Sequence, residues 1–279
     1  KGMYSIVDGM YKVAIEQGVQ FKFGEQVRNI NVVNGVAKSV STLKKLTNEQ
    51  KEYQFDVIVG AGDYHHIETK LLDARYQSYT SKYWDKRLMA PSSILYYVGL
   101  NKKLTGVQHH NLFFDTDFGI HGKEIYTNPA WPKDPLFYAS FPSVTDPTVA
   151  PAGQENMFLL IPIAAGLTGD TGEIRNMYFD KIVARMEQRF GQTISDSIVY
   201  KKSFAVSDFI SEYHSFKGNA YGLANTLMQT AILKPSCKSK KINNLYYTGQ
   251  LTVPGPGVPP SLISGEVVAA LVNQNFNQE

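Results

Sequence analysis

The chain contains 279 residues, of which 43% are hydrophobic and 19% charged, a composition that is typical of a folded globular protein and excludes an intrinsically disordered one. A formal net charge of +3 gives no electrostatic argument for a nucleic-acid partner, and the single cysteine, Cys237, excludes a disulfide within the chain. The longest apolar stretch, residues 157–167, is about half the ~20 residues that a membrane-spanning helix needs.

Helix and hairpin signals open the chain. The first 18 residues are predicted to form a helix, because apolar side chains recur at helical spacing and Gly18 follows them. Residues 27–33 and 36–40 alternate like strands on either side of Asn34 and Gly35. That dipeptide is the strongest short signal for a β-hairpin, so we expect two antiparallel strands here.

The next segment predicts a buried strand. A polar loop, 44–51, leads into the apolar run 55–60, which ends on the small residues Gly60-Ala61-Gly62. From residue 74 to residue 203 the character of the sequence changes, because Tyr and Phe become frequent and seven of the prolines occur between positions 129 and 162. Aromatic side chains supply large apolar walls, which suit either an ordinary core or an apolar ligand.

This aromatic middle part contains its own strand and helix signals. Strand-like runs occupy 93–100, 137–142 and 157–162, and an amphipathic helix is predicted over 172–190 with Gly191 closing it. The apolar side chains expected to share one face of that helix are Ile174, Met177, Ile182, Val183, Met186 and Phe190.

The end of the chain returns to the character of its beginning. Residues 244–249 are typical of a buried strand, and a Gly/Pro loop separates them from a last helix, 261–272. These patterns predict an α/β domain made of 1–73 and 204–279. A second, aromatic-rich domain with a mixed sheet and helices, 74–203, is expected to interrupt it.

The Gly/Pro loop has the features of a binding site for a flat or anionic group. Gly255 and Gly257 allow the backbone to pass close to a ligand where a Cβ would collide. Pro259 and Pro260 suit the first turn of a helix, and the free amides and dipole of that turn favour negative charge. A reduced, anionic flavin is a suitable guest. Spacing alone supports a plain strand-to-helix connection equally well.

The segment from Tyr247 to Gly265 resembles the carboxyl-terminal flavin signature of the bacterial phytoene desaturase family, Gly-x-x-Thr-x-Pro-Gly-x-Gly. Other stretches resemble that family in the same order along nearly the whole chain. They are Gly2-Met3-Tyr4, 56–66, 109–114, 142–147 and 150–153. The resemblance implies an FAD-binding Rossmann-like domain interrupted by a substrate domain.

The resemblance also implies which residues meet the cofactor. Residues expected to line the flavin and ribityl region are Gly249, Gln250, Pro254, Gly255, Gly257, Val258 and Pro259. Ala61 and Gly62 are expected in the same region. Val27 occupies either the backbone position that meets adenine or an ordinary strand position, and both interpretations stay open. Gln250 stands where many related flavoproteins have an acidic residue, which leaves its ribityl contact open.

The activity implied is desaturation of phytoene towards lycopene, in which FAD takes a hydride from an allylic carbon of a long isoprenoid. No catalytic residue is assigned. The resemblance implies a cytoplasmic enzyme in peripheral contact with the inner face of the cell membrane. The stretch of Tyr76, Tyr79, Tyr83, Trp84, Lys86 and Arg87 suits either a membrane interface or an ordinary surface helix.

Several alternatives stay open. Another carotenoid-acting flavin oxidoreductase (a later desaturase, ketolase, isomerase or saturase) would carry the same signature. An amine-oxidase-like enzyme or a redox-silent lipid-binding remnant are more distant alternatives. The family begins with Gly-x-Gly-x-x-Gly in a βαβ unit, to which nothing here corresponds, so we expect an incomplete FAD domain with poor FAD affinity of its own.

The histidine pairs 65–66 and 109–110 lack further ligands at metal-binding spacing, and no metal site is predicted.

Overall fold

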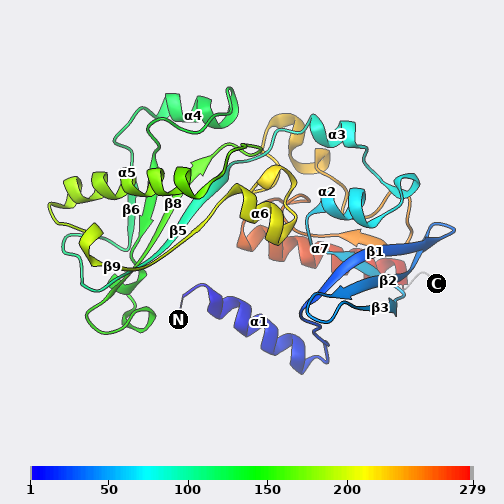
Figure 1. The fold of residues 1–279 in the computed structure, drawn as a ribbon. Coiled ribbons are helices and arrows are strands. Elements are labelled where there is room, and N and C mark those ends of the chain that lie inside the picture. Colours follow the sequence, from blue (N-terminus) through cyan, green and yellow to red (C-terminus); the bar gives the residue numbers. More distant parts are fainter. Residues whose placement is uncertain (1, 277–279) are drawn as a thin grey trace. The chain divides into compact units, whose positions relative to one another are not determined.

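The computed structural model describes residues 2–276, which form two compact units (Figure 1). The first unit comprises residues 2–21 and Ser92–Ser207, and the second comprises Lys22–Pro91 and residues 208–276. Both units mix helices and strands, so the predicted α/β class is confirmed. No helix within the described residues is both long enough and apolar enough to cross a membrane.

A five-stranded antiparallel sheet forms the centre of the first unit. Its two longest strands pair along their full length, from Ser92 opposite Ile163 to Leu100 opposite Glu155. The strands, in spatial order, are β6 (His110–Phe113), β7 (Phe137–Ser140), β8 (Glu155–Ile163), β5 (Ser92–Leu100) and β9 (Ile198–Phe204). The three strand runs predicted in this part of the sequence are therefore confirmed, whereas β6 and β9 were not predicted.

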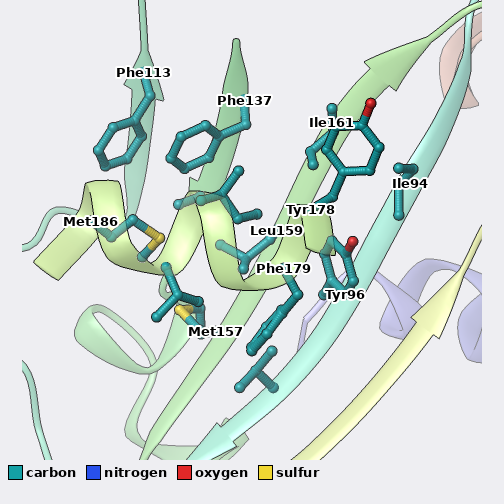
Figure 2. Packing of buried hydrophobic residues seen from close by; sticks show 14 of the residues in the cluster. Ile94, Tyr96, Phe113, Phe137, Met157, Leu159, Ile161, Tyr178, Phe179 and Met186 are labelled. Atoms are coloured by element: carbon teal, nitrogen blue, oxygen red, sulfur yellow. The ribbon is translucent and has the colours of Figure 1, made fainter. Parts of the chain in front are cut away.

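Helix α5 (Gly172–Phe190) covers one face of this sheet, as Figure 2 shows. Its bounds agree with the prediction, because Thr171 caps the first turn and Gly191, with φ of 65°, ends the last one. Tyr178, Phe179 and Met186 pack onto buried strand residues that include Tyr96, Met157, Leu159 and Ile161. The predicted face was wrong at Met177, which is 50% exposed, because the buried stripe centres on Ile182 and Met186 and leaves Met177 on the solvent side.

Two further helices belong to the first unit. Helix α1 (Tyr4–Glu16) forms as predicted, although none of its residues is buried. Helix α4 (Phe118–Tyr126) was not predicted, and its buried His121 anchors it. The imidazole accepts a hydrogen bond from the Leu136 amide at Nδ1 and its Nε2 lies 2.9 Å from the Pro162 carbonyl oxygen, which makes Nε2 the donor.

The second unit begins with a three-stranded antiparallel sheet of β1 (Glu25–Val33), β2 (Val36–Lys44) and β3 (Glu49–Gln54). The predicted hairpin is confirmed, because Asn34 and Gly35 take φ of 51° and 74° between β1 and β2. Strand β3 was missed, and part of it was assigned to a loop. Its side chains are polar and largely exposed, so no apolar alternation announces it.

A parallel strand pair and a long helix complete the second unit. Strand β4 (Ile58–Gly60) pairs with β10 (Leu245–Tyr247), and helix α7 (Val258–Phe276) follows β10. Val268 of α7 packs on buried Tyr246 and Cys237. The remaining helices are α2 (Tyr64–His66), α3 (Ser81–Asp85), α6 (Val206–Tyr213), a π-helix (Ile67–Leu71) and short 3₁₀ turns at Ala74–Tyr76, Pro142–Val144, Pro147–Val149, Ser195–Ser197, Phe216–Gly218, Leu227–Gln229 and Ala231–Leu233.

Replacing Ile161 by alanine should lower the free energy of unfolding of the first unit by about 2–5 kcal/mol, because this fully buried side chain would leave a cavity between β8 and α5. Urea titration measures the change. Ile120→Ala removes the same atoms from a side chain that is 56% exposed, and its effect should stay within about 0.5 kcal/mol. Equal effects of the two substitutions would contradict this packing.

Candidate functional site

The two parallel strands of the second unit bring two distant segments together at one edge. Because β4 and β10 run in the same direction, their carboxyl ends lie side by side. The Thr248 amide donates to the Gly60 carbonyl at 3.1 Å, and a Cβ built on Gly249 would lie 3.8 Å from the Ala61 carbonyl oxygen. Residues after both strands, which sequence reasoning assigned to one region, are therefore neighbours.

A pocket of about 350 Å³ opens at this edge. Its lining includes Ala61, Gly62, Asp63, Gln250 and Leu251, together with Phe209, Tyr213, Ser215, Asn219 and Ala220. Five of these residues come from the ends of the predicted strands, and the others come from α6 (Val206–Tyr213) and the segment that follows it. That segment carries no sequence motif, which is why sequence reasoning missed it.

Gln250 is held in place by the buried side chain of Asn219. The Gln250 amide group donates to Asn219 Oδ1 at 3.2 Å, and the Gly222 backbone amide donates to the same oxygen at 2.7 Å. Gly222 adopts φ of +73°, and a Cβ built there would lie 2.7 Å from the Gln250 carbonyl oxygen. Only glycine fits this position, because any other residue would push Gln250 away from the pocket.

Asp63 fixes the loops around the pocket. One carboxylate oxygen accepts from the His66 amide at 2.9 Å and thereby caps α2, and the other accepts from the Phe216 amide at 3.0 Å. Burial raises the pKa of Asp63 to about 6, although the backbone hydrogen bonds oppose that shift. Since both oxygens already accept main-chain amides, this carboxylate serves as an anchor and not as a free base.

Two buried side chains, Ser264 and Thr252, hold the start of the Gly/Pro loop between β10 and α7 by hydrogen bonds. Ser264 accepts from the Gly249 amide at 3.0 Å and lies 2.6 Å from the Thr248 hydroxyl. Thr252 donates from its amide and from its hydroxyl to the Gly249 carbonyl. The direction in which the chain leaves β10 is thus fixed by hydrogen bonds within the loop and α7.

The predicted loop residues Pro254, Gly255 and Gly257 follow, and the two glycines take φ of 134° and 115°. Helix α7 begins at Val258 and not at residue 261 as predicted, because proline is tolerated in a first turn. Val258 and Pro259 therefore lie in the exposed first turn, whose sequence Val-Pro-Pro-Ser contains no acidic side chain to neutralise the amides.

Lys234 supplies the observation that tests whether this loop suits a flavin. Its side chain is 5% exposed, and its ammonium has no hydrogen-bond partner within residues 2–276. A Cβ built on Gly255 would lie 3.0 Å from that ammonium. A loop that lacks side chains at Gly255 and Gly257, beside an uncompensated buried cation, fits a flat group that can carry negative charge, such as a reduced flavin ring. Sequence reasoning missed Lys234; its only signal is a lone lysine in the run Ala231-Ile-Leu-Lys-Pro235.

Val27 lies in a different pocket from the other predicted residues. That pocket, of about 510 Å³, is lined by β1, by α2 and by the 214–217 segment. His66 and His214 stack there with ring centres 4.1 Å apart, and burial lowers the pKa of His66 to about 4, so its imidazole is neutral near neutral pH. His65 packs on Phe216 at 4.0 Å. Val27 is 37% exposed, and its assignment to adenine stays a prediction.

The remaining polar candidates hold local structure. His109 and His110 contact Thr145 and Tyr138 at 2.6 and 2.5 Å, and Asp146 accepts from the Thr148 amide in a turn. Across the described part of the chain, no three His, Cys, Asp or Glu side chains are grouped so that they could hold a metal ion.

In the first unit, most of the sheet face opposite α5 is apolar and aromatic, and the exposed Lys202 of β9 pairs with Tyr97 at its margin. Alternation along the strands points Leu159 and Ile161 towards α5 and leaves Phe158 and Leu160 half-buried on the other side. In register with these two lie Tyr97, Leu95 and Tyr138, with Leu112 next to Tyr138 on β6. Tyr97 is 44% exposed and Leu112 is 64% exposed. We call this set, Leu95, Tyr97, Leu112, Tyr138, Phe158 and Leu160, the open sheet face.

Two rings of the aromatic stretch around residues 76–87 belong to the core of the second unit. Tyr79 is buried and its hydroxyl accepts from the Ser236 amide, and Trp84 is fully buried against Tyr64 and Phe216. Tyr83 stacks beneath Arg87, with the guanidinium carbon 4.4 Å from the ring centre. Both earlier interpretations of this stretch are wrong for Tyr79 and Trp84, because these rings belong to the core of the second unit.

Comparison with known proteins identifies the family. Residues 1–273 match the flavin containing amine oxidoreductase family. The chain belongs to this family. Because members of this family contain flavin, the match confirms the predicted cofactor.

Curated relatives include the carotenoid 3,4-desaturase of Haloarcula japonica, 40% identical over 96% of this chain and 53% of the relative. The zeta-carotene-forming phytoene desaturase of Myxococcus xanthus is 26% identical over 96% of this chain and 50% of the relative. The resemblance to carotenoid desaturases is thereby confirmed. The chain spans about half the length of these relatives.

A solved oxidoreductase from Methanosarcina mazei shares the fold, with a TM-score of 0.61 at 13% identity over 95% of this chain and 53% of that one. A second structure, the PF1083 protein of Pyrococcus furiosus, gives a TM-score of 0.56 at 13% identity over 96% of this chain and 51% of that one. At such identities the likeness concerns the fold alone.

Gly222→Ala should lower the melting temperature and detach Gln250 from Asn219, because the new Cβ meets the Gln250 carbonyl at 2.7 Å in a left-handed backbone. The cost of that backbone alone is about 1–2 kcal/mol. Gly265→Ala is the matched control, since a Cβ there meets no atom within 4 Å and alanine favours α7 by up to about 1 kcal/mol. Thermal unfolding of both variants measures the difference, and a neutral Gly222→Ala would refute the close approach.

Asp63→Asn should change how stability depends on pH. Because the pKa of Asp63 is raised from 3.8 to about 6 in the folded protein, folding takes up a proton between these values, and the wild type gains stability as pH falls through that window. The variant lacks this gain, which amounts to at most about 1.4 kcal/mol per pH unit. Thermal melts from about pH 7 to about pH 5 should show the wild type improving relative to the variant. Asp56→Asn controls for the loss of one surface carboxylate, and parallel curves for wild type and Asp63→Asn would contradict the raised pKa of Asp63.

Proposed function

We propose that this chain is part of an FAD-dependent carotenoid desaturase, in which the second unit contacts the flavin and the first unit contacts the polyene. The single observation that carries the proposal is the glycine loop with a buried, uncompensated ammonium beside it, at the edge where β4 and β10 end. Family membership makes flavin the expected guest at that loop.

In this proposal the flavin ring and ribityl chain contact the loops after the two parallel strands. Ala61 and Gly62 on one side, and Gly249 and Gln250 on the other, offer backbone and amide groups in the pocket of about 350 Å³. Pro254, Gly255, Gly257, Val258 and Pro259 follow in the loop and the first turn of α7, and we assign them to the same cofactor. Gln250 offers a neutral amide to a ribityl hydroxyl, in the place where related flavoproteins have a carboxylate.

A flavin held by these residues would supply the hydride acceptor for desaturation at an allylic carbon of the substrate. The residues of this chain bind and orient the flavin and the substrate, and they exclude water. Asp63 is occupied by two backbone amides, and no side chain of the described pocket is assigned as a base. Tyr64 and Tyr247 stack on each other at 3.7 Å in the core, so they do not form an open aromatic cage of the kind that an amine substrate would need.

The open sheet face suits a long apolar ligand such as an isoprenoid chain. Its six side chains carry no charge, and its aromatic members Tyr97, Tyr138 and Phe158 have ring centres 5.4 to 6.4 Å apart. Flat aromatic walls bind a conjugated or nearly conjugated chain through dispersion and through apolar area removed from water.

Two carotenoid substrates are in question. The sequence signature favours phytoene, with lycopene as the direction of the reaction. The 40% identity to a protein named carotenoid 3,4-desaturase, against 26% to 28% for proteins named phytoene desaturase, favours a later desaturation on a more unsaturated chain. We take desaturation of a carotenoid as the proposed activity and leave these two substrates to the experiment.

Peripheral contact with the inner face of the cell membrane remains part of the proposal, because carotenoids dissolve in bilayers. Support comes from β6 and α4, where four large apolar side chains stand exposed. They are Leu112, Phe114, Phe118 and Ile120, with exposed fractions of 56% to 71%. Exposed apolar clusters of this kind mark contact surfaces.

The test is expression of the complete reading frame that contains this chain in bacterial hosts that accumulate phytoene or lycopene, followed by pigment extraction. New double bonds in the phytoene host support the first substrate, and conversion in the lycopene host alone supports the later step. Unchanged pigments in both hosts, despite a yellow flavin-loaded protein, would refute carotenoid desaturation.

Tyr97→Glu should lower this conversion about tenfold or more and leave the flavin content unchanged. The reason is that binding an apolar chain to the open sheet face would remove the new carboxylate from water. Met177→Glu places the same charge on the exposed side of α5 and should keep wild-type conversion. Pigment yield per bound flavin measures both variants. Equal conversion by the two would remove the open sheet face from the substrate site.

A further inference from the structure

Lys234 is a charged residue whose burial is not explained by packing. The side chain is 5% exposed, and its ammonium finds no hydrogen-bond partner anywhere in the described chain. Burial lowers its pKa, as expected for a cation removed from water. An unpaired buried charge is strongly destabilising, so a lysine at this position needs a compensating negative group.

The ammonium is directed at one point of the loop between β10 and α7. A Cβ built on Gly255 would lie 3.0 Å from Nζ and 3.5 Å from Cε of Lys234. Gly255 is buried, and its φ of 134° is hardly accessible to other residues. The lysine therefore lies against the part of the loop that has no side chain.

The same loop leads directly into the first turn of α7. That helix has 19 residues, and its first turn carries no acidic side chain. Its free amides and dipole favour a negative charge at the entry to the helix. Two independent sources of positive potential, an ammonium and a helix start, thus flank Gly255 and Gly257.

We propose that Lys234 is the cation that stabilises the negative charge on the pyrimidine side of the flavin when the Gly255–Gly257 loop holds the ring. This inference rests on the proposed function and adds to it a binding residue outside every motif of the sequence. A hydride brings one negative charge to the flavin, so the interaction is stronger with the reduced cofactor than with the oxidised one. Lys234 therefore favours reduction.

A phosphate group of the cofactor offers the same anionic chemistry. The two sources differ in one respect, because the charge of the phosphates does not change when the flavin is reduced. A lysine that contacts phosphate contributes equally to both redox states and leaves the reduction potential unaltered. A lysine that contacts the ring shifts the potential.

The experiment uses flavin-loaded protein expressed from the complete reading frame, with Lys234→Met and Lys234→Arg compared with the wild type. Methionine keeps an unbranched apolar stem and removes the charge, whereas arginine keeps the charge. Lys45→Met is the control, because Lys45 is exposed in the same unit. The midpoint potential of the bound flavin is measured, together with the dissociation constant of oxidised FAD and the melting temperature of the apoprotein.

We expect Lys234→Met to reduce the equilibrium constant for flavin reduction about tenfold, which is about 30 mV for a two-electron couple. Lys234→Arg and Lys45→Met should stay near the wild type. In the apoprotein, Lys234→Met should raise the melting temperature, because an uncompensated buried charge is gone. This second measurement also tests the proposal if the methionine variant binds no flavin.

Four results would overturn the inference. An unchanged potential with unchanged FAD affinity removes Lys234 from the site. Weaker binding of oxidised FAD with an unchanged potential assigns it to phosphate. A less stable Lys234→Met apoprotein shows that the lysine is structural. A wild-type protein that takes up no FAD overturns the proposed function itself, and the inference with it.

Discussion

The parallel pairing of β4 with β10 is the constraint on which the candidate flavin site depends. Only three residue pairs form this ladder, from Ile58 with Leu245 to Gly60 with Tyr247. Parallel strands end at the same edge, and this brings together two loops that are separated by more than 180 positions in the sequence. The Asn244 side chain fixes the start of the pair by bonding to the Asp56 carbonyl and to Ala37 on β2. A shift by one residue would move Gly249 away from Ala61 and dismantle the edge.

Three charged side chains of the second unit, Glu68, Asp63 and Lys234, differ in how their charge is compensated. Glu68 is fully buried and accepts from the Tyr247 hydroxyl and from the amides of Ser78 and Tyr79. Asp63 accepts two backbone amides. These carboxylates are satisfied by the fold and hold it together. Lys234 stands apart, since its ammonium has no such partner in the structure of residues 2–276, and it is the charge that lies beside the glycine loop.

The sequence predicted what local rules determine. Asn34-Gly35 fixed the hairpin, Thr171 and Gly191 delimit α5, and the glycine loop marked one edge of a site. It did not predict β3, whose polar side chains carry no alternation, or the burial of Trp84, whose aromatic and basic neighbours resemble a surface stretch. The sequence also did not predict the roles of Asn219 and Gly222, because their contacts with Gln250 form only in the tertiary structure. Whether Val27 meets adenine stays a prediction.

The alternation of β8 gives the first unit two different apolar surfaces. Leu159 and Ile161 pack on α5 and are fully buried, while Phe158 and Leu160 emerge on the open sheet face. Burial of Leu159 and Ile161 stabilises the strand, so Phe158 and Leu160 are not needed for the core and are available for binding. Aromatic side chains stiffen such a face at little entropic cost, since each has two rotatable bonds. A rigid apolar wall recognises the length and flatness of a chain more than its polar ends. Under the proposed function, this wall would contact the apolar chain that all carotenoids share.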